Sequence, residues 1–146
     1  MNAANERCAI VGTIDPDAYT ANTYLTDAID MSKFDRVLFV VAVGDLTTNN
    51  TTDFSVHASA TSGGSYSLLA GSAITQLTEA GSDSDKQVLV EVKAIDVLAA
   101  GKQFVKGVLV TATAAADAAV IALGFDPQYG PASMYDLASV DEVINV

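Results

Sequence analysis

Short runs in which apolar and polar side chains alternate constrain the fold of this chain most. In residues 53–60 every second side chain, beginning with Phe54, is apolar, and Ser or His lies between them. Residues 87–93 repeat the pattern with three valines. A period of two over this length is typical of a strand with one face on a core and one face toward solvent. We therefore expect a protein built from half-buried β-strands.

Further runs of strand length complete an all-β pattern. They cover residues 8–14, 24–31, 36–43, 65–69, 103–113 and 117–125. Residues 73–79 fit either a strand or one or two helical turns, and residues 94–101 fit a helical turn that ends at Gly101. Seven to eight short strands with little helix between them predict an antiparallel β-sandwich of jelly-roll-like type, with extended or short-helical termini.

Two segments carry more specific expectations. Residues 36–43 are almost continuously apolar, which is typical of a strand buried on both faces. We expect them to form the central strand. Asp15, Pro16 and Asp17 are expected to end the first strand, because proline has a fixed φ and aspartate favours turns.

The length of 146 residues predicts a single domain, residues 1–146, with an N-terminal arm (1–6) and a C-terminal tail (128–146). Apolar residues of the tail recur every three or four positions, which fits a short amphipathic helix or an extended arm. An apolar tail beyond a finished sandwich needs a surface to cover it. The candidate interface residues are Tyr129, Met134, Tyr135, Leu137, Val140, Val143 and Ile144.

The charge of the chain limits its partners. Eighteen acidic and seven basic residues leave a formal charge of −11, and the basic residues do not cluster. Phosphate binding requires concentrated positive charge, so we expect no direct contact with nucleic acid. No apolar run approaches the roughly 20 residues that span a membrane. The first residues do not resemble a signal peptide, and synthesis in a cytoplasm is expected.

Residues with catalytic potential are few. The chain has one histidine, His57, and one cysteine, Cys8, which we expect to be exposed and buried respectively. We predict no enzyme activity, no cofactor and no metal centre. Two acidic pairs, Asp15 with Asp17 and Asp83 with Asp85, are expected in turns, with weak calcium binding as the alternative.

The aromatic residues fall into two groups. Phe34, Phe39, Phe54 and Phe104 lie in or beside predicted strands and are expected in the core. The tyrosines at 129 and 135 lie beyond the last strand. They are expected to pack either on their own sheet or on a neighbouring subunit.

Between Cys8 and Tyr129 the chain resembles small virion structural proteins of tailed double-stranded DNA bacteriophages, and more narrowly the capsid decoration, or cement, type. The pieces that carry the resemblance are Val11-Gly12, Tyr19 and Tyr24 leading to Met31, and residues 34–44, 74–83, 87–91 and 123–129.

The resemblance implies a protein on the exterior of the capsid that stabilises contacts between major capsid subunits and has no catalytic residues. Avidity favours a homo-oligomer at local three-fold positions, a homotrimer. Two alternatives stay open: a neck, tail or fibre-associated virion protein, and a β-sandwich module that binds glycans or peptides.

Overall fold

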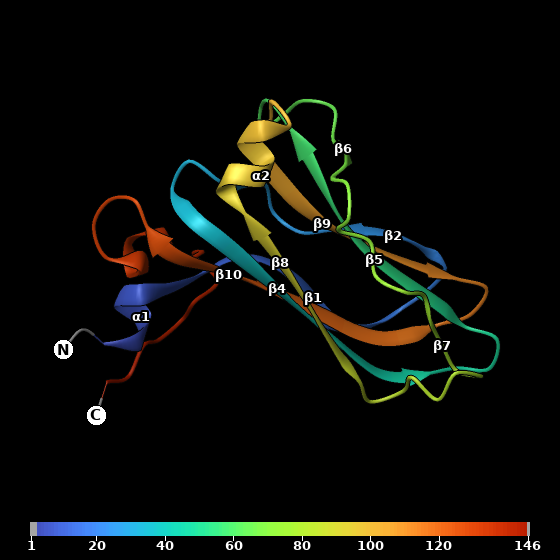
Figure 1. The fold of residues 1–146 in the computed structure, drawn as a ribbon. Helices are drawn as coiled ribbons and strands as arrows, with labels where there is room; N and C mark the ends of the chain where they lie inside the picture. The colour runs from blue at the N-terminus through green and yellow to red at the C-terminus, as the bar shows by residue number, and fades with distance from the viewer. Residues whose placement is uncertain (1–2, 146) are drawn as a thin grey trace.

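The computed structural model describes residues 3–145 of the chain, which are mostly β-strand (Figure 1). In chain order the elements are α1 (Ala4–Arg7), β1 (Cys8–Tyr19), β2 (Asn22–Leu25), β3 (Ile29–Asp30), β4 (Phe34–Leu46), β5 (Thr51–Ser59), β6 (Ser67–Leu68), β7 (Leu77–Thr78), β8 (Gln87–Lys93), α2 (Ala94–Ala99), β9 (Phe104–Ala112), β10 (Ala116–Pro127) and the 3-10 helix η1 (Ala132–Tyr135). Among the described residues, no helix is long and apolar enough to cross a membrane.

The strands form two antiparallel sheets that pack face to face. The first sheet has the order β1-β10-β4-β8, and the second has the order β2-β9-β5-β6. Because β3 follows β2 along β9, and β7 lies with β6 along β5, the ten strands fill eight positions. Numbered in chain order, these positions run 1-8-3-6 in one sheet and 2-7-4-5 in the other. This is the jelly-roll arrangement of two Greek keys, and the predicted all-β antiparallel sandwich is confirmed.

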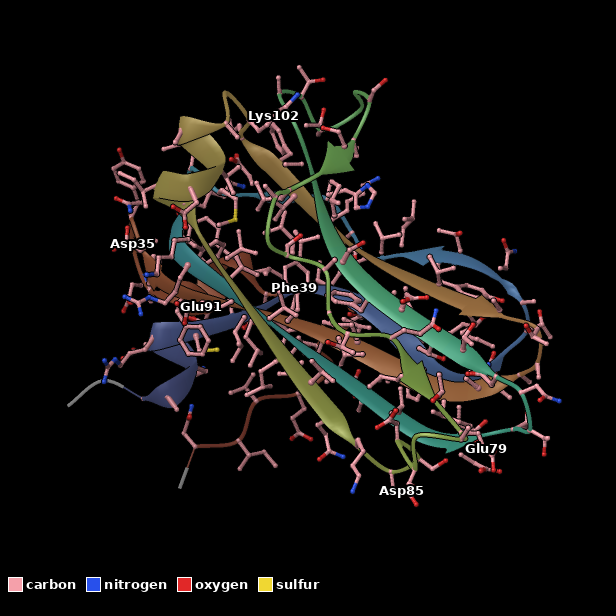
Figure 2. The ribbon with its side chains drawn as sticks, turned by 45° about the vertical axis from the view of Figure 1, so that its right-hand side comes forward. Asp35, Phe39, Glu79, Asp85, Glu91 and Lys102 are labelled. Atoms are coloured by element: carbon pink, nitrogen blue, oxygen red, sulfur yellow. The ribbon has the colours of Figure 1, made fainter. Side chains whose placement is uncertain are left out.

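The core lies between the sheets and is built from alternate residues of each strand. Phe39 of β4 lies between the two sheets (Figure 2). Phe39 and Phe54 of β5 are fully buried, and their ring centroids lie 5.6 Å apart. Glycines make room for these rings. A Cβ atom on Gly107 would lie 2.8 Å from the Phe54 ring, and one on Gly124 would lie 2.8 Å from the ring of Phe34. Each ring therefore lies over the bare backbone of the neighbouring strand in its own sheet.

The predicted end of the first strand at residues 15–17 is wrong. The strand β1 continues to Tyr19, with a shift in its pairing to β10 between Ile14 and Asp17. A β-bulge accommodates Pro16 there, and β1 lies at the sheet edge, where a missing N–H need not cost a ladder hydrogen bond.

Two other elements differ from the sequence-based boundaries. Residues 24–31 contribute to two strands, β2 and β3, because the hydroxyl of Thr26 accepts the N–H of Gly107 at 2.9 Å and interrupts the ladder. Residues 73–79 are mostly irregular and contain only the two residues of β7 as strand. The helical turn at 94–101 is confirmed as α2, and Gly101 follows it with φ of +70°, as expected of a C-terminal cap.

The tail is extended apart from the 3-10 turn η1 and a hydrogen-bonded turn at residues 137–140, so the extended arm is confirmed and the amphipathic helix is wrong. Such a helix would draw the tail away from the edge of β1, where its backbone finds hydrogen-bond partners. Residues 4–6 of the N-terminal arm belong to the single turn α1, which lies at the same end of the sandwich as the tail (Figure 1). Residues 1, 2 and 146 of the two predicted arms lie outside the described part of the chain.

Candidate interaction surface

The side chains with catalytic or metal-binding potential are dispersed. Within residues 3–145, no three His, Cys, Asp or Glu side chains lie close enough together to hold a metal ion. His57 lies on β5, opposite Leu68 of β6 and Lys106 of β9. Between these neighbours His57 is half-buried, so it is less exposed than the sequence predicted.

The acidic loop residues are engaged in local hydrogen bonds. The carboxylate of Asp83 accepts the N–H of Thr78 at 2.9 Å, and that of Asp17 accepts the N–H of Ala18 at 2.7 Å. Asp85 has φ of +59°, a conformation that aspartate tolerates in turns. Asp83 thus stabilises its own loop, whereas the expectation of a turn at Asp15 and Asp17 is wrong, because both residues lie within β1. Weak calcium binding stays a prediction.

The side of the first sheet that faces away from the second sheet is mostly apolar. We call this side the outer face. Its apolar residues are Cys8, Ile10, Leu38, Val40, Ala42, Leu89, Ala119, Ile121, Leu123 and Phe125. The strand register brings them into rows that cross the sheet. Ile121 of β10 lies opposite Val40 of β4, which in turn lies opposite Leu89 of β8.

Most of the outer face is left uncovered by the rest of the described chain, and α1 adjoins it only at the end formed by Cys8 and Phe125. Ile121 is 42% exposed and Leu89 is 63% exposed, while the other apolar residues of this face are half-buried. The expectation that residues 36–43 are covered on both faces is therefore wrong for the single chain. A two-layer sandwich covers each sheet on its inner side only, so the second apolar face of β4 is left to solvent.

Charged residues border the outer face. At one end, Arg36 of β4 lies 3.4 Å from the carboxylate of Asp126, and both side chains are about half exposed. Lys93 of β8 lies opposite Arg36 in the register. Asp117 is exposed at the other end of β10. An apolar centre inside a polar rim is the arrangement found in protein–protein interfaces.

Tyr135 of the tail packs on its own sandwich. Its ring lies 5.3 Å from that of Phe34 and 5.4 Å from the Lys33 amine, and its hydroxyl donates to the carbonyl of Tyr129 at 2.9 Å. Of the two arrangements expected for this tyrosine, packing on the parent chain is the one observed.

Beyond η1 the tail contacts the free edge of β1 at Ile10. The N–H of Leu137 donates to the carbonyl of Ile10 at 2.9 Å, and the carboxylate of Asp136 accepts the N–H of Ile10 at 2.7 Å. Leu137 and Val140 are half-buried. The candidate interface residues that stay exposed are Tyr129, Met134, Val143 and Ile144.

Two residues expected in the interior are only half-buried, namely Phe104 and Cys8. Partial burial, with a smaller contribution from the nearby carboxylate of Asp136, raises the pKa of the Cys8 thiol. Sequence reasoning missed Leu38, Val40 and the rest of the outer face as surface residues. The sequence did show that residues 36–43 are apolar on both sides. That pattern alone does not tell whether another part of the protein covers the second side.

The strand order defines this chain as a jelly-roll β-sandwich protein. No protein-family model and no curated protein sequence matches it. Among solved structures, it is similar to a chain in the structure of infectious bursal disease virus Gt strain, with 10% identity over 87% of this chain and a TM-score of 0.45. A chain of the Gx strain structure matches with 11% identity over 86% of this chain and a TM-score of 0.42. This chain spans about a third of each, 35% and 34%.

Proposed function

We propose that this chain is a virion structural protein of a tailed double-stranded DNA bacteriophage, of the capsid decoration type. It binds the exterior of the head through the outer face of its first sheet and stabilises contacts between major capsid subunits. The observation that carries the proposal is the uncovered apolar outer face, in which Ile121 and Leu89 are the most exposed residues. Contiguous apolar patches with polar rims mark sites of protein contact.

The rigidity of this face suits a clamping protein. Its central strands, β10 and β4, are each paired on both sides, so Ile121 and Val40 are held by two ladders. Side chains that are already ordered lose little conformational entropy on binding. A larger share of the interaction energy is then available to hold capsid subunits together.

The charge and the tail support the same assignment. A formal charge of −11 disfavours contact with packaged DNA and favours a position outside the capsid shell. The tail, which meets β1 at Ile10, carries exposed apolar side chains of its own, Met134 and Ile144. The sequence resemblance to decoration proteins adds to these physical arguments.

The proposal is tested by adding the purified chain to undecorated capsids of its phage and measuring co-sedimentation and capsid heat resistance. We expect binding and a higher capsid melting temperature. Ile121→Glu places a carboxylate in the centre of the outer face and is expected to reduce binding at least tenfold. Leu25→Glu is the matched control, because Leu25 is similarly exposed but lies on the second sheet.

Three outcomes contradict the decoration role. The first is no binding, or binding without any gain in capsid heat resistance. The second is electron-microscopic density for the chain only at the neck or tail of the particle, which favours the tail-associated alternative. The third is specific binding on a glycan array with no affinity for capsids. Equal capsid binding by Ile121→Glu and Leu25→Glu would show that the outer face is not the surface that binds the capsid.

A further inference from the structure

Three of the four sheet edges of the sandwich are blunted. At β1, the tail hydrogen-bonds to Ile10, and two register shifts bend the strand. The edge formed by β2 and β3 is interrupted between residues 25 and 29, and β6 and β7 are two residues each. Short, broken, bulged or covered edges prevent unwanted strand pairing in β proteins.

The fourth edge, β8, has none of these features in the described structure. It pairs with β4 from Lys93 to Gln87 without a register shift, and it contains neither glycine nor proline. The N–H of Val43 donates to the carbonyl of Lys86 at 2.9 Å. Since the bonding direction alternates along an antiparallel strand, residues 86, 88, 90 and 92 face β4. The N–H and C=O groups of residues 87, 89, 91 and 93 therefore point to the open side.

Apolar side chains accompany these open backbone groups. Leu89 is 63% exposed at the end of the row that begins with Ile121 and Val40. Val88 and Val90 point toward the core, yet both are half-buried because the sheet ends beside them. An added strand would pair with the backbone of β8 and cover these side chains.

We propose that a second copy of this chain pairs through β8, antiparallel, about a two-fold axis at Leu89. The two first sheets then form one continuous sheet, and the two outer faces join into one surface. In this register Leu89 lies opposite the partner's Leu89, and Gln87 lies opposite the partner's Glu91. This contact does not depend on the proposed role in the capsid.

The side chains of β8 are complementary to a second copy of themselves in this register. At each end the amide of Gln87 lies opposite the partner's Glu91 and can donate to its carboxylate, and the centre is apolar. Moving the axis to Glu91 would instead place two carboxylates directly opposite each other, which destabilises a cross-strand pair. Glu91, whose charge otherwise discourages pairing at this edge, thus gains an amide partner in this arrangement.

The mass of the purified chain in solution, measured by light scattering after size exclusion, tests this inference. We expect twice the chain mass, in contrast to the homotrimer expected from the sequence. Leu89→Pro removes an N–H that points away from β4, so the own-chain ladder stays intact. This variant is expected to be a monomer at concentrations where the parent chain is a dimer, with its thermal unfolding temperature as the check on folding.

Disulfide trapping tests the register. Opposed residues that exchange hydrogen bonds in an antiparallel pair lie about 5.5 Å apart at Cα, within the range that a disulfide bridges. In a Cys8→Ser background, Leu89→Cys is therefore expected to cross-link two chains on oxidation. Glu91→Cys is the matched control, since the two copies of residue 91 would be about 13 Å apart along the strands.

The inference is overturned by a monomer or a trimer at high protein concentration, or by a dimer that Leu89→Pro leaves intact. Cross-linking of Glu91→Cys at the same rate as Leu89→Cys would overturn the register about Leu89. A failure of capsid binding would leave these results unaffected, so the two proposals fail separately.

Discussion

The ring of Tyr135 meets the ring of Phe34 edge-on, with their centroids 5.3 Å apart. This contact joins residues about a hundred positions apart and holds the tail against the start of β4. Phe34 is fully buried and lies over the bare backbone of Gly124. The tail is therefore part of the sandwich, and it closes the side at which β1 ends the first sheet.

Replacing Tyr135 with alanine is expected to lower the free energy of unfolding by about 1–3 kcal/mol, through lost aromatic contact and burial. Urea unfolding followed by circular dichroism measures the change. Tyr129→Ala is the control, because the Tyr129 side chain is exposed and only its carbonyl contacts Tyr135. Equal effects of the two substitutions would contradict the packing of the tail on Phe34.

Gly124→Ala is expected to destabilise the chain by about 1–3 kcal/mol, because the new methyl group would overlap the Phe34 ring. The comparison is Gly63→Ala, where no atom lies within 4 Å of the added Cβ. Thermal unfolding of both variants provides the measurement. A variant at Gly124 as stable as the parent chain would show that the ring is free to shift.

Ser72 satisfies the backbone N–H of Val56 at the broken edge of the second sheet. Its hydroxyl accepts the Val56 N–H at 3.1 Å and lies within donating distance of two carbonyls, those of Leu69 at 2.7 Å and Val56 at 2.9 Å. The Val56 carbonyl also accepts the N–H of Leu69, so Ser72→Ala leaves the Val56 N–H as the buried group without a partner, and we expect a loss of about 1–3 kcal/mol. The exposed Ser65→Ala should change stability by less than about 0.5 kcal/mol in the same denaturant titration.

Asp30 is expected to make stability depend on acid pH. Partial burial by itself raises the pKa of Asp30, but hydrogen bonds from Gln103 and Ser32 and the charge of Lys33 outweigh it, so the pKa lies below its ordinary value. A carboxylate with a lowered folded-state pKa stabilises the fold above its unfolded pKa, near 4. That contribution is lost as the pH falls through the folded-state pKa.

Urea midpoints measured between pH 6 and pH 2.5 test the role of Asp30. The Asp30→Asn variant is expected to lose less stability than the parent chain over the acidic part of this range. Asp141→Asn, a change in the exposed tail, should leave the acid dependence as it is in the parent chain. Identical curves for all three proteins would contradict the assignment to Asp30.

The local elements followed closely from the sequence. The alternation at residues 87–93 matches β8 residue for residue, and Phe39 and Phe54 lie in the core as expected. Gly101 follows the end of α2 in the left-handed backbone conformation, which glycine adopts at little cost in free energy. These features depend on side-chain periodicity and backbone preference within a few residues, which a single sequence contains.

The strand partners and the outer face were decided by the tertiary structure. Pro16 sits in β1 because a bulge at a sheet edge removes its cost, and Leu38 and Val40 are surface residues because no third layer covers their side of β4. Periodicity tells which side chains share a face, but only long-range packing decides which faces meet. The sequence by itself therefore determined the strands and their apolar sides, and the tertiary structure decided which of those sides, and which edge, remain open.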